Sequence, residues 1–450
     1  MRTIFITSFH PLISRNIISS GVLPALTQKG DIRVVVIVPD YKRAFFGETY
    51  PYPGVTYEGV DVGPAVRSRR VALLKRIAGA LPNTKRAAIG RRRTLSGTLK
   101  PAWVYWLFYV PIGLLGKSRL AMRLFRAIDF RIAPAGRFYP LLDRYRPDLV
   151  FSTDIQNEHD VALMQDARRR GHRILGMVRS WDNLTMRALR FLPTHILVHS
   201  EIMKEEAVRY HGLRPDAVTV TGVPHYDRYL GGPTLPRENF LRSLGLDPGR
   251  RTILYAPICD YRLQENSVDT YVTGILAGLG LNVIVRFPPA ASATISGVEG
   301  SRTMIFDRPG NVFDPKRIDD RELTPDDDRR FVNELAACDL VVAGPTTVVI
   351  DAALFDKPII LVDFYPRPVR PEERIYEYGA EHVLNILSTG GCRRIESREA
   401  FLKAIGEYLQ NPAADRPGRE RIIREQCWNT DGKSSERIAQ YLLGILREYQ

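Results

Sequence analysis

One stretch of this chain, Cys338–Asp363, has the pattern of a strand, a tight loop, a helix and a second strand within 26 residues. Leu340–Ala343 is an apolar run of strand type, and Gly344-Pro345 ends it. The following residues predict a helix over Thr346–Phe355, because a threonine is a good N-cap. Such a unit is typical of α/β proteins with a parallel sheet.

The loop of this unit predicts an anion site. The first N-H groups of a helix have no acceptor within the helix, and the helix dipole adds positive potential there. We expect the amides and hydroxyls of Thr346 and Thr347, next to Gly344, to hold a diphosphate. Asp351 lies four residues after Thr347, on the same side of the helix, where it could take ribose hydroxyls. The alternative is an ordinary crossover whose threonines only cap the helix.

Several short motifs stand in one order along the second half of the chain. After the paired hydroxyl residues come an apolar helix, an acid and a basic residue before proline: Thr346, Thr347, Asp351, Lys357 and Pro358. The others are TGVPHYD at 221–227, YAP at 255–257, VIVR at 283–286 and DGKSSERIAQYL from 431. Over roughly residues 175–450 the sequence resembles the CDP-glycerol glycerophosphotransferase family and its relatives among GT-B glycosyltransferases. The resemblance implies a nucleotide-activated donor as substrate and no separate cofactor.

Two positions depart from that family's pattern. The strand that ends in Arg286 is usually followed by a His-Pro pair, but here Pro288 takes the histidine position. The Asp-Tyr expected before the hydroxyl pair is Gly344-Pro345. Both changes remove groups expected to handle glycerol phosphate, and they favour sugar transfer.

The alternation of strands and helices predicts an α/β protein of two domains, since 450 residues exceed one ordinary core. We expect the GT-B type, with two doubly wound Rossmann-like domains facing a central cleft. The boundaries are 1–225 for an acceptor domain and 237–430 for a nucleotide-donor domain. A helix over 431–450 would pack back on the first domain. Near the N-terminus a helix is expected from about Ser14 to Gln28.

The formal charge of +14 is concentrated in one insertion of the first domain, at about 65–128. This segment has fifteen Lys/Arg and no acid, and it contains the aromatic stretch Pro101–Gly116. That stretch is too short to span a bilayer, so we predict that the insertion binds an anionic membrane surface. The alternatives are a core segment with a solvated basic face, or a nucleic-acid site, which no motif supports.

The cysteine spacing and the N-terminal residues indicate the cellular compartment of the protein. The four cysteines are widely spaced and form no C-x-x-C pair, which favours a reducing cytoplasm and no metal site. The N-terminus alternates like a first strand rather than a signal peptide. We therefore predict a cytoplasmic protein, peripheral to the inner face of the cytoplasmic membrane.

Catalytic candidates follow two predicted strands of the first domain. His10 comes directly after the first strand, and an imidazole titrates near neutral pH, so it is the first candidate for a base. Asp154 follows a later strand and could orient His10 or act as the base itself. The alternative for His10 is a structural His-Pro turn.

Substrate contacts are expected from polar residues near the same edge. The run Arg179, Ser180, Trp181, Asp182 and Asn183 suits sugar stacking and hydroxyl contacts, or else a buried tryptophan under a capped loop. His225 could face either domain. Arg286, with Arg262 as a second candidate cation, is expected to help hold the diphosphate.

The leading functional hypothesis is a metal-independent glycosyltransferase that moves a sugar from a nucleotide donor to a lipid-linked or polysaccharide acceptor. The alternatives are a CDP-glycerol-type polyol-phosphate transferase and a non-enzymatic membrane-surface scaffold. A non-hydrolysing UDP-sugar epimerase shares the fold, but the acid-rich motifs of such enzymes are missing here.

Overall fold

The computed structural model describes residues 1–450 except 29, 64–67, 94–102, 264–265, 315–319 and 448–450. Parts of the basic insertion, the first two residues of the aromatic stretch and residues 448–450 of the helix expected over 431–450 lie outside the described residues. The chain divides into two compact units. Unit 1 is Met1–Asp227 with Cys427–Gln450, and unit 2 is Arg228–Gln426.

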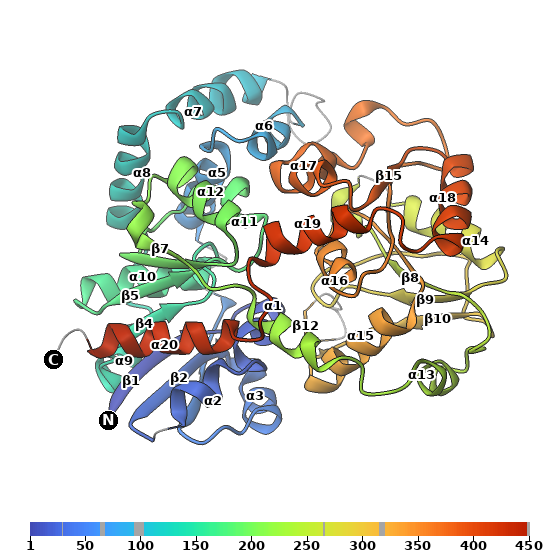
Figure 1. The fold of residues 1–450 in the computed structure, drawn as a ribbon. Helices are drawn as coiled ribbons and strands as arrows, with labels where there is room; N and C mark the ends of the chain where they lie inside the picture. Colours follow the sequence, from blue (N-terminus) through green and yellow to red (C-terminus); the bar gives the residue numbers. More distant parts are fainter. Residues whose placement is uncertain (29, 64–67, 94–102, 264–265, 315–319, 448–450) are drawn as a thin grey trace. The chain divides into compact units, whose positions relative to one another are not determined.

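Unit 1 is built on a seven-stranded parallel sheet in the order β3-β2-β1-β4-β5-β6-β7 (Figure 1). The strands are β1 (Arg2–Thr7), β2 (Ile32–Pro39), β3 (Val55–Val60), β4 (Leu149–Ser152), β5 (Ile174–Met177), β6 (His195–Val198) and β7 (Val218–Val220). The central strands are almost wholly buried, as expected for apolar runs covered on both faces.

Helices cover both faces of this sheet. One face packs against α1 (Pro11–Ile13), η1 (Ser14–Ile18), α2 (Val22–Thr27), α3 (Arg43–Thr49) and α20 (Ser434–Arg447). The other packs against α9 (Tyr139–Tyr145), α10 (Glu158–Arg169), α11 (Asn183–Met186) and α12 (Glu201–His211). The short pieces η2 (Asp40–Lys42) and η4 (Pro215–Ala217) each lie between a strand and a helix, and η5 (Pro224–Gly231) begins in unit 1 and ends in unit 2. Although α20 is last in sequence, its apolar side belongs to the same core as β1.

The helix predicted from Ser14 to Gln28 is broken in two. It begins earlier, at Pro11, continues as a π-helical turn in η1, and resumes as α2 after Gly21. Pro11 starts the helix because proline is tolerated in a first turn. The π-turn buries Asn16, which a regular helix pattern does not predict.

The basic insertion forms a helical layer of unit 1 with a small core of its own. Its elements are α5 (Arg69–Ala80), α6 (Lys85–Arg92), η3 (Tyr105–Tyr109), α7 (Val110–Leu115) and α8 (Arg119–Ile132) (Figure 1). Leu74, Ala78, Met122 and Phe125 form that core together with Ala188 of the main body. Among the described residues, none of the helices has the length and apolar character needed to cross a bilayer.

Unit 2 has a six-stranded parallel sheet in the order β10-β9-β8-β13-β14-β15. The strands are β8 (Thr252–Ala256), β9 (Asn282–Arg286), β10 (Met304–Asp307), β13 (Leu340–Ala343), β14 (Ile359–Val362) and β15 (Arg393–Ile395), beside the antiparallel pair β11 (Asn311–Val312) and β12 (Arg321–Glu322). Its helices are α13 (Arg237–Ser243), η6 (Asp260–Arg262), α14 (Val268–Ala277), α15 (Pro325–Ala337), α16 (Val348–Leu354), η7 (Pro371–Glu373), η8 (Tyr376–Gly379), α17 (Glu381–Ser388), α18 (Arg398–Gln410) and α19 (Arg416–Cys427). Two Rossmann-like α/β sheets confirm the predicted fold class.

Candidate active site

Strand order places a candidate site on each unit. In a doubly wound sheet, ligands bind at the carboxyl ends of the strands, where the order reverses. In unit 1 the reversal lies between β1 and β4, and in unit 2 it lies between β8 and β13. His10 and Asp154 follow the first pair of strands, and Gly344 follows β13. The predicted residues therefore cluster at two switch points.

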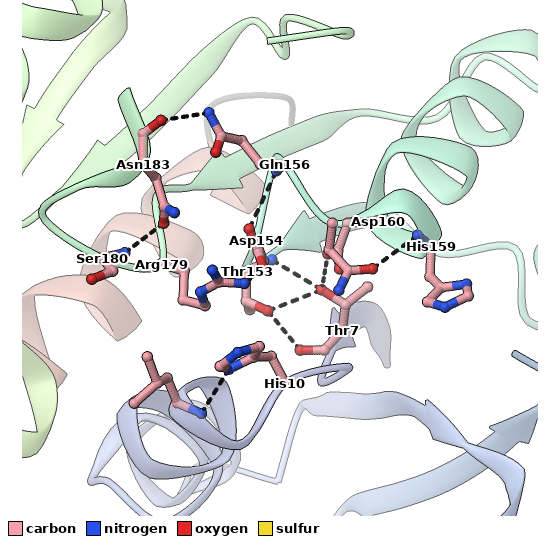
Figure 2. A network of polar contacts seen from close by, with 12 residues as sticks. Thr7, His10, Thr153, Asp154, Gln156, His159, Asp160, Arg179, Ser180 and Asn183 are labelled. Atoms are coloured by element: carbon pink, nitrogen blue, oxygen red, sulfur yellow. Dashed lines mark hydrogen bonds and ion pairs between the residues drawn. The ribbon is translucent and has the colours of Figure 1, made fainter. Parts of the chain in front are cut away.

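His10 is held by its own turn. Its Nδ1 accepts a hydrogen bond from the Leu12 N-H at 3.1 Å, which caps α1 (Figure 2). Burial, followed by Arg179 and Lys42, lowers the pKa of His10, so the ring is neutral at pH 7. Because Nδ1 accepts, the proton of the neutral ring lies on Nε2. In this geometry His10 offers a hydrogen-bond donor rather than a base.

This tautomer predicts different effects for two substitutions. In His10→Gln the side-chain amide can still donate, so we expect turnover within a few-fold of wild type. His10→Ala removes the donor, and we expect about a tenfold loss, the value of one hydrogen bond. Steady-state kinetics of the two variants test this. Equal, large losses in both would show that His10 is a base.

Asp154 is paired with Arg179. The carboxylate is almost fully buried and forms an ion pair with the guanidinium, which comes from the loop after β5. Figure 2 shows Arg179 lying between Asp154 and His10. Within the described residues, no hydrogen bond joins Asp154 to His10, so the expected orienting role is absent. The Arg179 Nε is buried and has no described hydrogen-bond partner.

Gln156 joins the loops after β4 and β5. Its Nε2 donates to the Asn183 carbonyl at 2.8 Å and to the Arg187 carbonyl at 3.1 Å. Asn183 Oδ1 in turn accepts from the Ser180 N-H at 2.9 Å (Figure 2). The predicted substrate residue Asn183 thus shapes the loop, and Asp182 stands at the start of α11 without a side-chain cap bond.

Trp181 and His225 differ in their surroundings. Trp181 is only 9% exposed, which favours the buried alternative over stacking on a sugar. His225 shares a hydrogen bond with Asn16 Oδ1, and Asn16 Nδ2 donates to the Arg179 carbonyl at 3.5 Å. His225 is therefore linked to the His10 edge through Asn16.

Asp160 connects the two strands of the switch point. Its Oδ1 accepts from the hydroxyl of Thr7, at the end of β1 (Figure 2), and from the hydroxyl of Ser152, in β4. Burial, with a smaller contribution from the nearby Asp154, raises the pKa of Asp160 to about 8. A protonated carboxyl at neutral pH therefore lies beneath the candidate site.

Replacing Asp160 by asparagine is expected to change how stability depends on pH. The folded state keeps a proton that the unfolded carboxyl loses near pH 4, so this group lowers wild-type stability as pH rises from about 4 to 8. The variant has no titrating carboxyl at this position. Its free energy of unfolding relative to wild type should therefore increase by about 1.4 kcal/mol per pH unit. Urea unfolding of both proteins between pH 5 and 8 measures this difference in stability. Parallel stability curves would contradict the assignment.

The turn after β13 is tighter than the predicted helix start. The helix α16 begins at Val348 rather than Thr346, because the Thr346 N-H donates to the Gly344 carbonyl at 2.8 Å. Thr347 is the N-cap residue, but its side chain makes no cap bond. Among the described residues, the Thr347 N-H has no acceptor. The Thr346 Oγ1 is buried without a described partner.

Gly344 is required by a close approach. A Cβ at this position would lie 2.8 Å from Ile258 Cγ1 and 3.2 Å from its Cα. Ile258, in the loop after β8, is fully buried and cannot move aside. The two loops of the unit 2 switch point therefore pack directly against each other.

We expect Gly344→Ala to destabilise unit 2 by about 1–3 kcal/mol through overpacking and to weaken nucleotide binding by displacing the turn. Gly274→Ala on α14 is the matched control, since nothing lies within 4 Å of its added Cβ. Helix propensity predicts that the control substitution raises the free energy of unfolding by up to about 1 kcal/mol. Denaturant unfolding compares the two. Equal stability of both variants would show that the loops do not need this contact.

Arg286 and Asp351 do not reach the predicted ligand. Arg286 Nη1 lies 2.6 Å from Asp307 Oδ2 and 2.9 Å from Glu334 Oε2, so its guanidinium is already bonded to two buried acidic side chains. Burial raises the pKa of Glu334 to about 7. Asp351 is 1% exposed and accepts a hydrogen bond from the Tyr229 hydroxyl, which blocks the expected ribose contact. Both expectations are corrected.

Some polar residues of these edges escaped prediction. Gln156 stands two residues after Asp154 in a strand-end loop, so its position was a usable signal. Asn16 lies in a segment with the pattern of a regular helix, so its position gave no signal of a role at this edge. Asp269 accepts from the N-H groups of Ile258 and Cys259 and fixes the loop after β8, although its sequence position is that of a first-turn helix acid. Within the described residues, no group of three or more His, Cys, Asp or Glu has the arrangement of a metal site.

Solved structures with the same architecture align over nearly the whole chain. The UDP complex of MnaA from S. aureus covers 99% of this chain and 97% of its own, with TM-score 0.55 and 12% identity. UDP-GlcNAc 2-epimerase from Neisseria meningitidis bound to UDP-GlcNAc covers 99% and 100%, with TM-score 0.56 and 11% identity. A variant of the wall teichoic acid polymerase TagF covers 99% and 89%, with TM-score 0.52 and 10% identity. At such identities the likeness shows the fold.

The two-sheet architecture and these neighbours show the GT-B fold. The sequence profile of the CDP-glycerol:poly(glycerophosphate) glycerophosphotransferase family matches residues 151–444, which makes the chain an enzyme of the glycosyltransferase class. The chain belongs to this family, which confirms the resemblance seen in its motifs. No curated protein sequence matches the chain at a significant level.

Proposed function

We propose that this protein transfers a group from a nucleoside diphosphate donor to an acceptor hydroxyl during cell-surface polymer or glycolipid assembly. The family match over residues 151–444 carries this proposal, since it includes all of unit 2 and the later strands of unit 1. The two switch-point edges supply the groups that such a reaction needs.

Unit 2 holds the donor in this proposal. The Thr347 N-H and the buried Thr346 hydroxyl, both without a described partner, face the departing diphosphate at the positive end of α16. Backbone donors of this kind need no rearrangement as charge develops on the leaving group. Arg286 has no part in this contact, because its guanidinium is already bonded to Asp307 and Glu334.

Unit 1 binds the acceptor. Asp154 is the remaining candidate for the base, since the His10 ring offers a donor at Nε2. Arg179 holds the Asp154 carboxylate and keeps one buried N-H for a substrate oxygen. His225 and Asn183 border the same edge through Asn16 and Gln156.

Two kinds of transferred group are favoured by different observations. The family match favours a polyol phosphate, such as glycerol phosphate from CDP-glycerol, in a teichoic-acid-like polymer. Pro288 in place of the family's histidine, and Gly344-Pro345 in place of Asp-Tyr, favour a sugar. The preferred donor base separates them, because a polyol-phosphate transferase should prefer CDP to UDP or GDP.

The insertion of unit 1 gives the protein a surface suited to anionic lipid. On α8 the residues Leu120, Leu124, Ile128 and Ile132 recur every four positions and are 66, 54, 54 and 42% exposed. Trp103 and Trp106 are 62 and 63% exposed beside η3. An exposed apolar stripe within a segment of fifteen basic residues is typical of an interfacial helix. It would place the protein at the inner face of the cytoplasmic membrane.

A thermal-shift panel of CMP, CDP, UDP, GDP and TDP tests the proposed donor. A bound nucleotide raises the melting temperature, and the preferred base then selects the donor for a transfer assay. Turnover with that donor would exclude the scaffold alternative. Absence of any shift with all five nucleotides would contradict the proposal.

A further inference from the structure

Two opposite charges of unit 2 lie buried side by side without a hydrogen bond between them. Arg262 Nε is 3.6 Å from Glu377 Oε1, beyond hydrogen-bond distance, and the side chains are 11 and 6% exposed. Among the described residues, neither Arg262 Nε nor Glu377 Oε2 has a hydrogen-bond partner. Buried polar atoms are rarely left in this state, and a buried ion pair needs such bonds to offset lost hydration.

Both side chains are positioned by the carboxyl ends of neighbouring strands. Arg262 ends η6, directly after β8, and its Nη1 donates to the Ile258 carbonyl at 3.3 Å. Glu377 lies in η8, which is tied to the end of β14 because the Tyr378 hydroxyl donates to the Val362 carbonyl at 2.6 Å. Since β13 lies between β8 and β14, the pair bridges the end of β13.

The predicted diphosphate turn belongs to the same neighbourhood. Ile258, whose carbonyl holds Arg262, is also the residue that packs against Gly344 at the start of the turn. The buried Thr346 Oγ1, two residues later, is likewise without a described partner. A guanidinium N-H, a carboxylate oxygen and a hydroxyl therefore lack partners around one loop.

The loop that carries Arg262 is rigidly held before any ligand binds. Asp269 accepts from the Ile258 N-H at 2.8 Å and from the Cys259 N-H at 3.3 Å. Cys259 has φ 78°, a conformation that a non-glycine residue adopts only when its surroundings enforce it. The unfilled hydrogen-bonding positions are therefore a fixed feature of this edge.

We propose that Arg262 and Glu377 together bind the nucleotide part of the donor, Arg262 through the diphosphate and Glu377 through the ribose hydroxyls. The assignment rests on the proposed function. A guanidinium fork matches phosphate oxygens, and a carboxylate can only accept, so beside a diphosphate it must bind hydroxyl donors. Glu377 thus takes the ribose role expected of Asp351.

The ribose contact is tested by calorimetric titration of the wild-type protein with CDP and with 2′,3′-dideoxy-CDP, or with the UDP pair if UDP binds more tightly. A hydrogen bond to a charged acceptor predicts about ten- to hundredfold weaker binding of the dideoxy compound. In Glu377→Gln this preference should fall below about threefold. A variant that keeps the wild-type preference would overturn the assignment.

The diphosphate contact is tested with CDP and CMP. Arg262→Lys keeps the charge but loses the planar fork, so its preference for CDP over CMP should drop about tenfold while the ribose preference stays unchanged. Arg370→Gln is the control, an exposed arginine of the same unit that pairs with Glu373, and it should alter neither ratio. Unchanged CDP/CMP preference in Arg262→Lys would contradict the arginine's role.

The outcomes separate this inference from the proposed function. If wild-type protein binds none of these nucleotides, the proposed function fails. If it binds CDP and the dideoxy compound equally, the assignment of Glu377 fails and the proposed function stands. That wild-type comparison needs no variant, so it decides the matter even if Glu377→Gln does not fold.

Discussion

Replacing Asp154 by asparagine is expected to lower turnover by about 10²–10⁴-fold, the usual contribution of a general base. Asparagine keeps the size of the side chain and can still accept a hydrogen bond from Arg179, but it cannot take a proton. Nucleotide affinity should remain at the wild-type value, because the donor residues belong to unit 2. Initial rates and nucleotide titrations measure the two effects separately.

The matched control is Asp143→Asn. Asp143 also pairs with an arginine of unit 1, Arg170 at 2.8 Å, but this pair is exposed and lies away from the carboxyl edge. The Asp143→Asn substitution should change the turnover rate by less than twofold. A wild-type rate in Asp154→Asn would exclude Asp154 as the base, and a comparable loss in the control would indicate a general effect of charge.

Three serine substitutions on α8, Leu120→Ser, Leu124→Ser and Ile128→Ser, are expected to weaken binding to anionic vesicles by about a hundredfold. Each leucine or isoleucine contributes on the order of 1 kcal/mol when partly inserted into a bilayer interface, so three together contribute about 3 kcal/mol. The side chains are exposed in the structure, so fold stability should be unaffected. Cosedimentation with phosphatidylglycerol vesicles measures the change.

Leu230→Ser with Leu235→Ser is the control, because these two leucines of unit 2 are 62 and 42% exposed outside the basic insertion. Vesicle binding of this control should equal that of wild type. Raising salt should weaken wild-type binding, since the cations of the insertion add electrostatic attraction. If wild-type protein stays in the supernatant at low salt, the membrane surface assigned to the insertion is wrong.

Apolar patterns predicted the strands closely. The apolar run Leu340–Ala343 is a strand with the predicted bounds, because a buried parallel strand needs an unbroken apolar run between breakers. Helix starts were less predictable. Whether Thr346 belongs to α16 depends on its bond to the Gly344 carbonyl, and that turn is set by contact with Ile258.

Side-chain environments were the part that sequence could not provide. Arg286 ends a strand in a motif shared with the family, and nothing local distinguishes a free guanidinium from one bonded to Asp307 and Glu334. Those partners come from β10 and α15, far away in sequence. Glu377 had no motif at all, since only the bond from Tyr378 to the end of β14 brings it to the edge.

We propose that the turn after β13 binds a diphosphate with its own amide. Calorimetric titration of wild type and Thr347→Pro with CDP and UDP tests it most directly. The φ of −62° at Thr347 suits proline, so the substitution removes one N-H with little strain. Arg398→Pro, at the first position of α18, is the control. We expect saturable binding in wild type and control and at least tenfold weaker binding in Thr347→Pro. Equal affinity in all three proteins, or no saturable binding in wild type, would contradict it.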